Sequence, residues 1–289
     1  MKQIVMCLCI TLMLMISIPV MAGDIDENVK YYNSANGSLY LQPLADGFGA
    51  ALNSGLYHDA KIEKFGLHFY LNVQFMGALI TDDQKTFTSV AEEDMTAGIT
   101  LPTVFGSEEE VDAGLSFKPR GAYETSILPI AIPQLTVGSF AGTELNFRFF
   151  QMTVDESIGD LKILGYGARH SLSQYVPLFP VDVAVSYFHQ KFEIGNIVEA
   201  NASYIGIQAS KKVAVLLLYG GLGFESSNLN ISYTYEDEED TSEIEFDLDG
   251  KSKARFTLGV GLDLKFFKLH ADYNLASQKT VTAGIGFGL

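Results

Sequence analysis

Alternation of apolar with polar or small residues along residues 255–289 is the feature that most constrains this chain. Every second residue from Arg255 to Phe266 is apolar, and the same pattern returns twice before the end. A period of two predicts strands with one apolar face. Short connections make them an antiparallel meander. The apolar members are Phe256, Leu258, Val260, Leu262, Leu264, Phe266, Leu269, Ala271, Tyr273, Leu275, Val281, Ala283, Ile285, Phe287 and Leu289.

A meander that runs to the last residue leaves a long edge strand unless the sheet closes on itself. In lipid, a closed sheet satisfies every backbone group, and its apolar face can meet hydrocarbon. We therefore predict an all-β fold, an antiparallel transmembrane β-barrel.

The composition agrees with a barrel whose outside faces lipid. Apolar residues make up 47% of the chain and charged residues 19%, yet beyond the first residues no stretch is long enough for a membrane helix. The formal net charge of −16 disfavours nucleic acid as a partner.

The first residues are typical of a secretory signal peptide. Lys2 precedes an apolar stretch from Ile4 to Val20, and Val20-Met21-Ala22 is a small-residue cleavage site. The alternative is a membrane anchor, for which this stretch is at the short limit. We expect cleavage near Ala22 and insertion into the outer membrane of a Gram-negative bacterium. Cys7 and Cys9 lie in the removed part, so the mature chain would carry no disulfide.

We expect three parts: a signal peptide (1–22), an N-terminal segment (23–64) and a barrel (65–289). Residues 43–52 predict a short helix that stops at Asn53-Ser54-Gly55. Two interpretations stay open, a plug inside the barrel and a lead-in that shields its floor. The plug candidates are Pro43, Leu44, Phe48 and Asn53.

Ten strands follow from alternation, over residues 65–80, 134–139, 143–152, 160–171, 181–194, 197–210, 213–225, 255–266, 268–275 and 279–289. A turn at Lys211-Lys212 would separate two of them. Residues 81–133 hold prolines and acidic clusters that indicate loops. One further pair of strands there gives a prediction of about 12, within a range of 10–14.

Residues 226–252 form an acidic excursion in which 228–235 and 243–249 can pair as a hairpin above the membrane. The spacing of a calcium loop is missing, so we interpret it as a solvated surface loop.

Charged residues opposite the apolar face would point into the lumen. They form either a charged constriction that selects solutes or an ion-pair network that fills a narrow barrel. The candidates are Glu144, Arg148, Arg169, Asp263, Lys265 and Asp272.

Five scattered histidines lack metal-ligand spacing, and no nucleophile elbow is present. We therefore expect no metal, no cofactor and no enzyme. A lipid hydrolase in the barrel wall stays an alternative, because catalytic triads assemble in space rather than in sequence.

Several short runs have a distinctive sequence: Pro43-Leu44, Gly47-Phe48-Gly49, residues 52–55, Pro133-Gln134-Leu135, residues 142–145 with Arg148, and residues 165–170. These runs resemble an uncharacterised family of predicted outer-membrane proteins from Bacteroidetes-type bacteria. The resemblance implies location and fold rather than chemistry. An N-terminal segment that enters a barrel also resembles the fatty-acid transporter superfamily, although the Asn-Pro-Ala signature of that superfamily is absent.

We expect a monomer in outer-membrane lipid that passes a small hydrophobic or amphipathic solute and is gated by its N-terminal segment. The alternatives are a filled structural or surface-exposed barrel without transport and the barrel-wall lipid hydrolase.

Overall fold

The computed structural model describes residues 28–29, 31–32, 34–92, 95–155, 159–176, 179–236 and 241–288. The predicted signal peptide, its cleavage site near Ala22, the tip of the acidic excursion and Leu289 lie outside the described residues.

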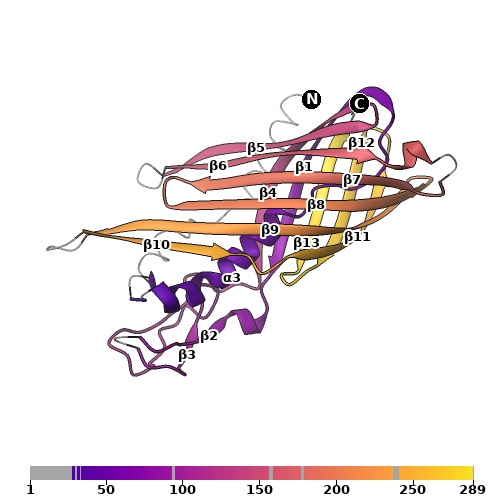
Figure 1. Cartoon of the computed structure of the whole chain (residues 1–289). Coiled ribbons are helices and arrows are strands. Elements are labelled where there is room, and N and C mark those ends of the chain that lie inside the picture. The colour runs from indigo at the N-terminus through magenta and orange to yellow at the C-terminus, as the bar shows by residue number, and fades with distance from the viewer. Residues whose placement is uncertain are drawn as a thin grey trace.

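Ten antiparallel strands close into a barrel (Figure 1). Pairing of β1 with β13 and of β8 with β9 completes the ring. Because the sheet closes on itself, the ring has no edge strand whose backbone N–H and C=O groups would face hydrocarbon. The strands are β1 (Phe65–Leu79), β4 (Ile127–Phe140), β5 (Thr143–Asp155), β6 (Gly159–Ser171), β7 (Asp182–Ile194), β8 (Val198–Val213), β9 (Leu216–Glu236), β11 (Ala254–Asp263), β12 (Phe267–Leu275) and β13 (Thr280–Gly288).

Each of the ten predicted strands corresponds to one barrel strand, whereas the further pair expected in residues 81–133 is wrong as part of the barrel. There the short strands β2 (Thr86–Thr88) and β3 (Thr100–Pro102) pair only with each other. One more strand, β10 (Thr241–Asp249), pairs with β9 outside the ring, which confirms the predicted hairpin.

Strand β4 begins seven residues before the predicted start at Gln134, because Pro129 and Pro133 indicated a loop. Residues 127–133 pair with β1, but the ladder between β4 and β5 begins only at Gln134. Proline is tolerated in a strand where no ladder partner needs its missing N–H. The prolines therefore lie along a seam where β4 and β5 have separated.

The turn predicted at Lys211-Lys212 is also wrong. Strand β8 continues to Val213, and the chain turns at Ala214, whose φ is +55°. Both lysines pair in the ladder with β9, so their polarity alone suggested a break that the backbone does not make.

The outer surface is apolar along the middle of the strands and polar above it. On β9 the outward side chains Leu222 and Phe224 are 58% and 73% exposed. They are followed by Ser226, Asn228 and Asn230, which are polar. The same change occurs from Leu164 to Lys162 on β6 and from Tyr187 to Lys191 on β7. This apolar belt is the surface that a membrane barrel presents to lipid.

The two ends of the barrel differ in their connections. Turns of two or three residues join β4 to β5, β8 to β9 and β11 to β12 at one end, where a loop with the 3-10 helix η2 (Ser173–Tyr175) also lies. The two longest excursions, residues 80–126 with the 3-10 helix η1 (Asp82–Gln84) and the β9–β10 hairpin, lie at the other end beside the short connections from β5 to β6, β7 to β8 and β12 to β13. Long loops face the outside in such barrels, so we assign the end with residues 80–126 as extracellular.

Helix α3 (Ser34–Leu52) enters the lumen from the extracellular end (Figure 1). Residues 53–64 then continue toward the periplasmic end, where β1 begins at Phe65. We call residues 34–64 the plug. No described helix has the length and apolarity needed to span a membrane.

The lumen has an apolar upper half and a polar lower half. Around α3 the side chains of Leu44, Phe48, Ile132, Ile163 and Phe192 form one buried cluster. Below Leu52 the wall presents buried amides, hydroxyls and charges instead, among them Asn72, Gln74, Asn146, Gln208 and Thr257.

Glycines on the lumen face make room for aromatic rings. A Cβ at Gly259 would lie 2.1 Å from the Tyr219 ring, and one at Gly223 would lie 2.4 Å from the Tyr204 ring. In the plug, a Cβ at Gly49 would meet the Ser227 hydroxyl at 1.9 Å. The Gly-rich alternation of the wall is therefore a packing requirement.

Replacing Leu222 with lysine should lower the free energy of unfolding by about 2–4 kcal/mol, because a charge would face hydrocarbon. The matched change Ser226→Lys, at the edge of the apolar belt on the same strand, should cost about 0–1 kcal/mol. Urea titration in lipid vesicles measures both. Equal losses at the two positions would show that Leu222 does not face lipid.

Candidate functional site

Arg148 on β5 binds the end of the plug helix. Its five N–H groups donate to the carbonyls of Leu52, Ser54 and Gly55 at 3.0, 2.8 and 2.7 Å and to the amide oxygens of Gln134 and Gln190 at 2.8 and 2.7 Å. A guanidinium has five donors, so every one is used. All five acceptors are uncharged.

Arg255 on β11 binds the same end of the helix through a different set. Its Nε donates to Glu225 on β9 at 2.7 Å, and its Nη2 donates to the Ala50 carbonyl at 2.8 Å. Its Nη1 donates to the hydroxyls of Ser54 and Thr280 at 2.6 and 3.3 Å. The Arg255 and Glu225 side chains are each 1% exposed, so this ion pair is fully buried.

These two arginines, which we call the upper clamp, come from opposite walls, since β5 and β11 face each other across the ring. The last carbonyls of a helix lack intrahelical partners and carry the negative end of the helix dipole. The two guanidinium cations, one from each wall, donate hydrogen bonds to these carbonyls and place positive charge beside the negative end of the dipole. The upper clamp therefore fixes the C-terminal end of α3 near the centre of the lumen.

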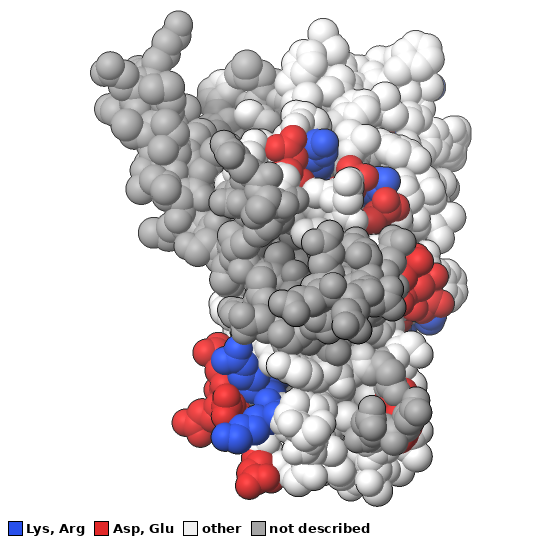
Figure 2. Space-filling view, turned by 90° about the vertical axis from the view of Figure 1, so that its left-hand side faces the viewer, with Lys and Arg blue, Asp and Glu red and all other residues white. Residues whose placement is uncertain are grey.

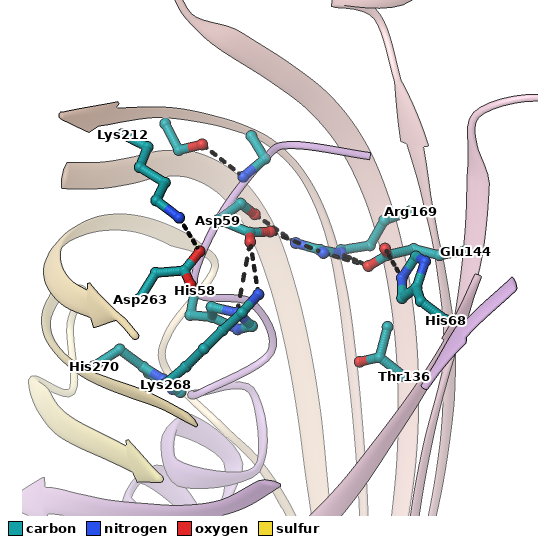
Figure 3. Close-up of polar contacts among 12 residues, drawn as sticks. His58, Asp59, His68, Thr136, Glu144, Arg169, Lys212, Asp263, Lys268 and His270 are labelled. Atoms are coloured by element: carbon teal, nitrogen blue, oxygen red, sulfur yellow. Dashed lines mark hydrogen bonds and ion pairs between the residues drawn. The ribbon is translucent and has the colours of Figure 1, made fainter. Parts of the chain in front are cut away.

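A second set of charges holds the plug nearer the periplasm (Figure 3). The Asp59 carboxylate lies 3.3 Å from Arg169 Nη2 on β6 and 3.7 Å from Lys268 Nζ on β12. Arg169 also donates to the Asp59 carbonyl. Strands β6 and β12 again face each other across the ring. Asp59 thus links two opposite walls, and we call this set the lower clamp.

The lower clamp continues into neighbouring groups. Arg169 Nε donates to Glu144 at 2.6 Å, and Glu144 lies 3.5 Å from His68 Nε2. On the other side the rings of His58 and His270 stack at 4.8 Å. These residues form a continuous polar band across the lumen (Figure 3).

Five of the six predicted lumen residues have polar partners in or beside the lumen. Glu144, Arg148 and Arg169 belong to the clamps. Asp272 is buried and accepts from Tyr219 and Asn274 at 2.9 and 2.6 Å. The last of the five, Asp263, pairs with Lys212 at 2.6 Å at the periplasmic end.

Lys265 does not enter the lumen, and its prediction is wrong. It lies exposed in the turn between β11 and β12 with a φ of +75°. The alternation continues through Leu264 and Phe266 in the sequence, but the strand has already ended at Asp263.

All four predicted plug residues are buried in the lumen. Leu44 and Phe48 pack in the apolar cluster, and Asn53 donates to the Ser226 carbonyl at 3.3 Å. Pro43 lies inside α3, which begins nine residues before the predicted start at Pro43. The segment thus lies in the barrel instead of shielding it from below.

Sequence reasoning missed Arg255, Glu225 and Asp59. The first two were open to prediction, because each lies in phase with the lumen-facing residues of its strand, one position from Phe256 and from Phe224. Asp59 lies in a segment without periodicity, so only the folded structure brings it to Arg169.

A cleft of about 420 Å³ lies at the extracellular mouth between α3 and the barrel rim. Its plug side is formed by Leu39, Gln42, Pro43 and Asp46, and its rim side includes Gln84, Phe87 and Gln278. Asp46 accepts from the Lys251 backbone N–H at 2.9 Å and pairs with its Nζ at 3.3 Å. A hydrogen bond from the Thr81 side chain lowers the pKa of Asp83 on the rim.

Two histidines contact hydroxyl groups outside the lumen. His189 lies 2.9 Å from the Ser203 hydroxyl, and His170 lies 2.8 Å from Thr143. Within the described ranges neither histidine pairs with a carboxylate, so neither has the third member of a hydrolytic triad. In the same part of the chain, no three potential metal ligands gather.

A family model covers the whole chain. The chain belongs to a family of unknown function, DUF6588, whose model matches residues 1–289. No curated protein matches the chain. The Bacteroidetes-type source stays a prediction.

Among solved structures, the chain is similar to the outer-membrane protease OmpT from Escherichia coli, with 8% identity over 79% of this chain and 98% of that one and a TM-score of 0.36. It is also similar to a FadL homologue of Pseudomonas aeruginosa, with 9% identity over 87% and 96% and a TM-score of 0.28. For the N-terminal barrel domain of OprF from Pseudomonas aeruginosa, the values are 14%, 51%, 94% and 0.25. The fold assignment rests on the strand pairing of this chain itself.

Replacing Arg255 with methionine should lower the free energy of unfolding by about 3–5 kcal/mol, because Glu225 would stay buried without a partner. The double variant Arg255→Met/Glu225→Gln should recover part of this loss. Lys212→Met, which removes a half-exposed pair, should cost about 1 kcal/mol or less. Urea titration measures these three variants and the single variant Glu225→Gln. A double variant that loses the sum of the Arg255→Met and Glu225→Gln losses would contradict a coupled buried pair.

Proposed function

We propose that the protein is an outer-membrane barrel that passes a small, partly apolar solute and that the plug is its gate. The observation that carries the proposal is the plug itself. Residues 34–64 run along the lumen, are continuous with the wall only at Phe65, and are held by two clamps from opposite walls.

The chemistry of the clamps supports a gate better than a permanent filling. Charges in a lumen cost desolvation, and apolar packing of the same volume is often as stable or more stable. The upper half already shows that the chain can fill its lumen with apolar residues. Polar clamps fix one arrangement of the plug and can be exchanged for water when the plug moves.

The closed ring also supports a monomer as the working unit. Pairing of β1 with β13 and of β8 with β9 closes the sheet. Along the seam, residues 127–133 of β4 lack a β5 partner, but Pro129 and Pro133 disfavour pairing with a second copy there. Lipid is then the partner of the apolar belt, and the solute is the partner of the lumen.

A filled structural barrel without transport is the second candidate. It is favoured by the burial of the upper clamp and its partner Glu225. As whole residues, Arg148, Arg255 and Glu225 are 3%, 3% and 6% exposed. Conductance of variants that weaken or lock the plug separates the two candidates.

A disulfide between Gly47→Cys on α3 and Ala78→Cys on β1 should lock the plug. A Cβ at Gly47 would lie 3.7 Å from the Ala78 Cβ, within the range of disulfides. In planar bilayers the oxidised variant should conduct potassium chloride at least tenfold less than the same protein after reduction. Each single-cysteine variant serves as its control and should not respond to reductant.

Equal conductance of the oxidised and reduced forms would show that the plug is not the gate. The variant Arg148→Ala, which removes one half of the upper clamp, should conduct more often than the wild type. If folded Arg148→Ala protein and reduced double-cysteine protein both pass no current, the filled barrel is correct.

A further inference from the structure

The extracellular cleft joins the plug to the barrel rim, and its lining identifies a class of ligand. We propose that it binds a small uncharged solute with several hydroxyl groups and one apolar face, such as a mono- or disaccharide. The binding of this solute is independent of transport. Its role as the first step of passage rests on the proposed function.

Uncharged hydrogen-bonding side chains are the most numerous kind in the lining. Three glutamines, Gln42, Gln84 and Gln278, lie among threonines that include Thr81 and Thr86. Amides and hydroxyls both donate and accept, which matches a ligand whose hydroxyls do the same. Gln84 donates to Gln278 at 2.6 Å, and a ligand hydroxyl between the two amides would replace this bond. A few such groups in a pocket of 300–1,000 Å³ fix the orientation of a small ligand.

Pro43 adds a backbone acceptor to the cleft. A proline inside a helix has no N–H for the carbonyl four residues before it. In α3 that carbonyl belongs to Leu39, and both residues line the cleft. The Leu39 carbonyl can therefore accept a hydrogen bond from a hydroxyl of the ligand.

The charges of the cleft disfavour an ionic ligand. Asp46 and Lys251 already pair with each other, and Asp83 and Lys279 place one charge of each sign on the rim. Across the described part of this end face, acidic and basic side chains lie in small groups of mixed sign (Figure 2). An anion or a cation would meet its like charge as well as its opposite, whereas a neutral solute meets neither penalty.

An apolar side completes the match. Leu39, Pro43 and the largely buried Phe87 line the same cleft as the glutamines. A sugar ring has this character, because its C–H groups gather on one face and its hydroxyls lie around the edge. Such a solute buries apolar area without leaving its hydroxyls unpaired.

The position of the cleft links binding to the gate. Leu39, Gln42, Pro43 and Asp46 have the spacing of one helix face, so α3 itself forms one wall. Gln42 also donates to Asp46 and to the Asp249 carbonyl, both at 3.0 Å. A solute that bonds to Gln42 competes with the contacts that hold the top of the plug.

The test uses the full-length mature protein in lipid nanodiscs, because alkyl glycoside detergents would compete. Saturation-transfer NMR and calorimetry would measure binding of maltose and sucrose, with laurate as the apolar anionic comparison. We expect at least one disaccharide to bind and laurate not to displace it. Gln84→Ala and Thr86→Val should each weaken that binding at least fivefold.

Gln151→Ala is the matched control, since Gln151 is an exposed glutamine at the same end of the barrel but outside the cleft. Heat-modifiable migration in gel electrophoresis would show that each variant is folded, and Thr86→Val removes one exposed hydroxyl with little change in shape. Binding of laurate but of neither disaccharide, equal binding by all variants, or no binding of either disaccharide would each overturn the proposal. Conductance of the locked and unlocked plug is measured without sugar, so failure here leaves the gate hypothesis tested separately.

Discussion

Every backbone N–H and C=O at membrane depth needs a partner within the protein, because hydrocarbon offers none. The ring of ten strands meets this constraint by closing through the β1–β13 and β8–β9 pairings, apart from the seam at residues 127–133 where β4 and β5 have separated. The alternation along each strand then places apolar side chains on the outside. The lumen must be filled by protein or by water. The composition, the glycines behind aromatic rings and the position of the plug all follow from this separation.

The plug brings a new set of unsatisfied backbone groups into the lumen. A helix that ends inside a protein exposes its last carbonyls, and each unpaired buried acceptor costs about 1–3 kcal/mol. Arg148 and Arg255 satisfy these carbonyls from opposite walls. Below them, Asp59 joins Arg169 to Lys268. The segment is thus fixed at two heights by contacts that water could replace.

Much of the barrel could be predicted from the sequence, because lipid on one side and polar groups on the other impose a period of two. The prediction failed in segments where the alternation of apolar and polar residues is absent. Residues 127–133 were predicted as a loop because they hold Pro129 and Pro133. Both prolines are tolerated in β4 because this part of the strand has no β5 partner. Helix α3 was only half predicted, since a helix buried on nearly every side shows no amphipathic period.

The candidate site was also predictable only where strands alternate. Alternation places Glu144, Arg148 and Arg169 in the lumen, and it would have placed Arg255 and Glu225 there as well. The sequence could not predict which of these residues would bind the plug. Their partners, Asp59 and the carbonyls of residues 50–55, belong to a segment without the strand alternation. Lys265 failed because the chain turns before the alternation in the sequence ends.

Labelling of single cysteines at the two ends of the plug tests the central claim most directly. Cys7 and Cys9 lie in the predicted signal peptide, so after its removal Ala35→Cys and Lys64→Cys would be the only targets, and both residues are exposed. A membrane-impermeant maleimide should label Ala35→Cys in intact cells and Lys64→Cys only after the outer membrane is permeabilised. Equal labelling of both positions in intact cells, or labelling of Lys64→Cys alone, would contradict a plug that runs through the barrel from the cell surface to the periplasm.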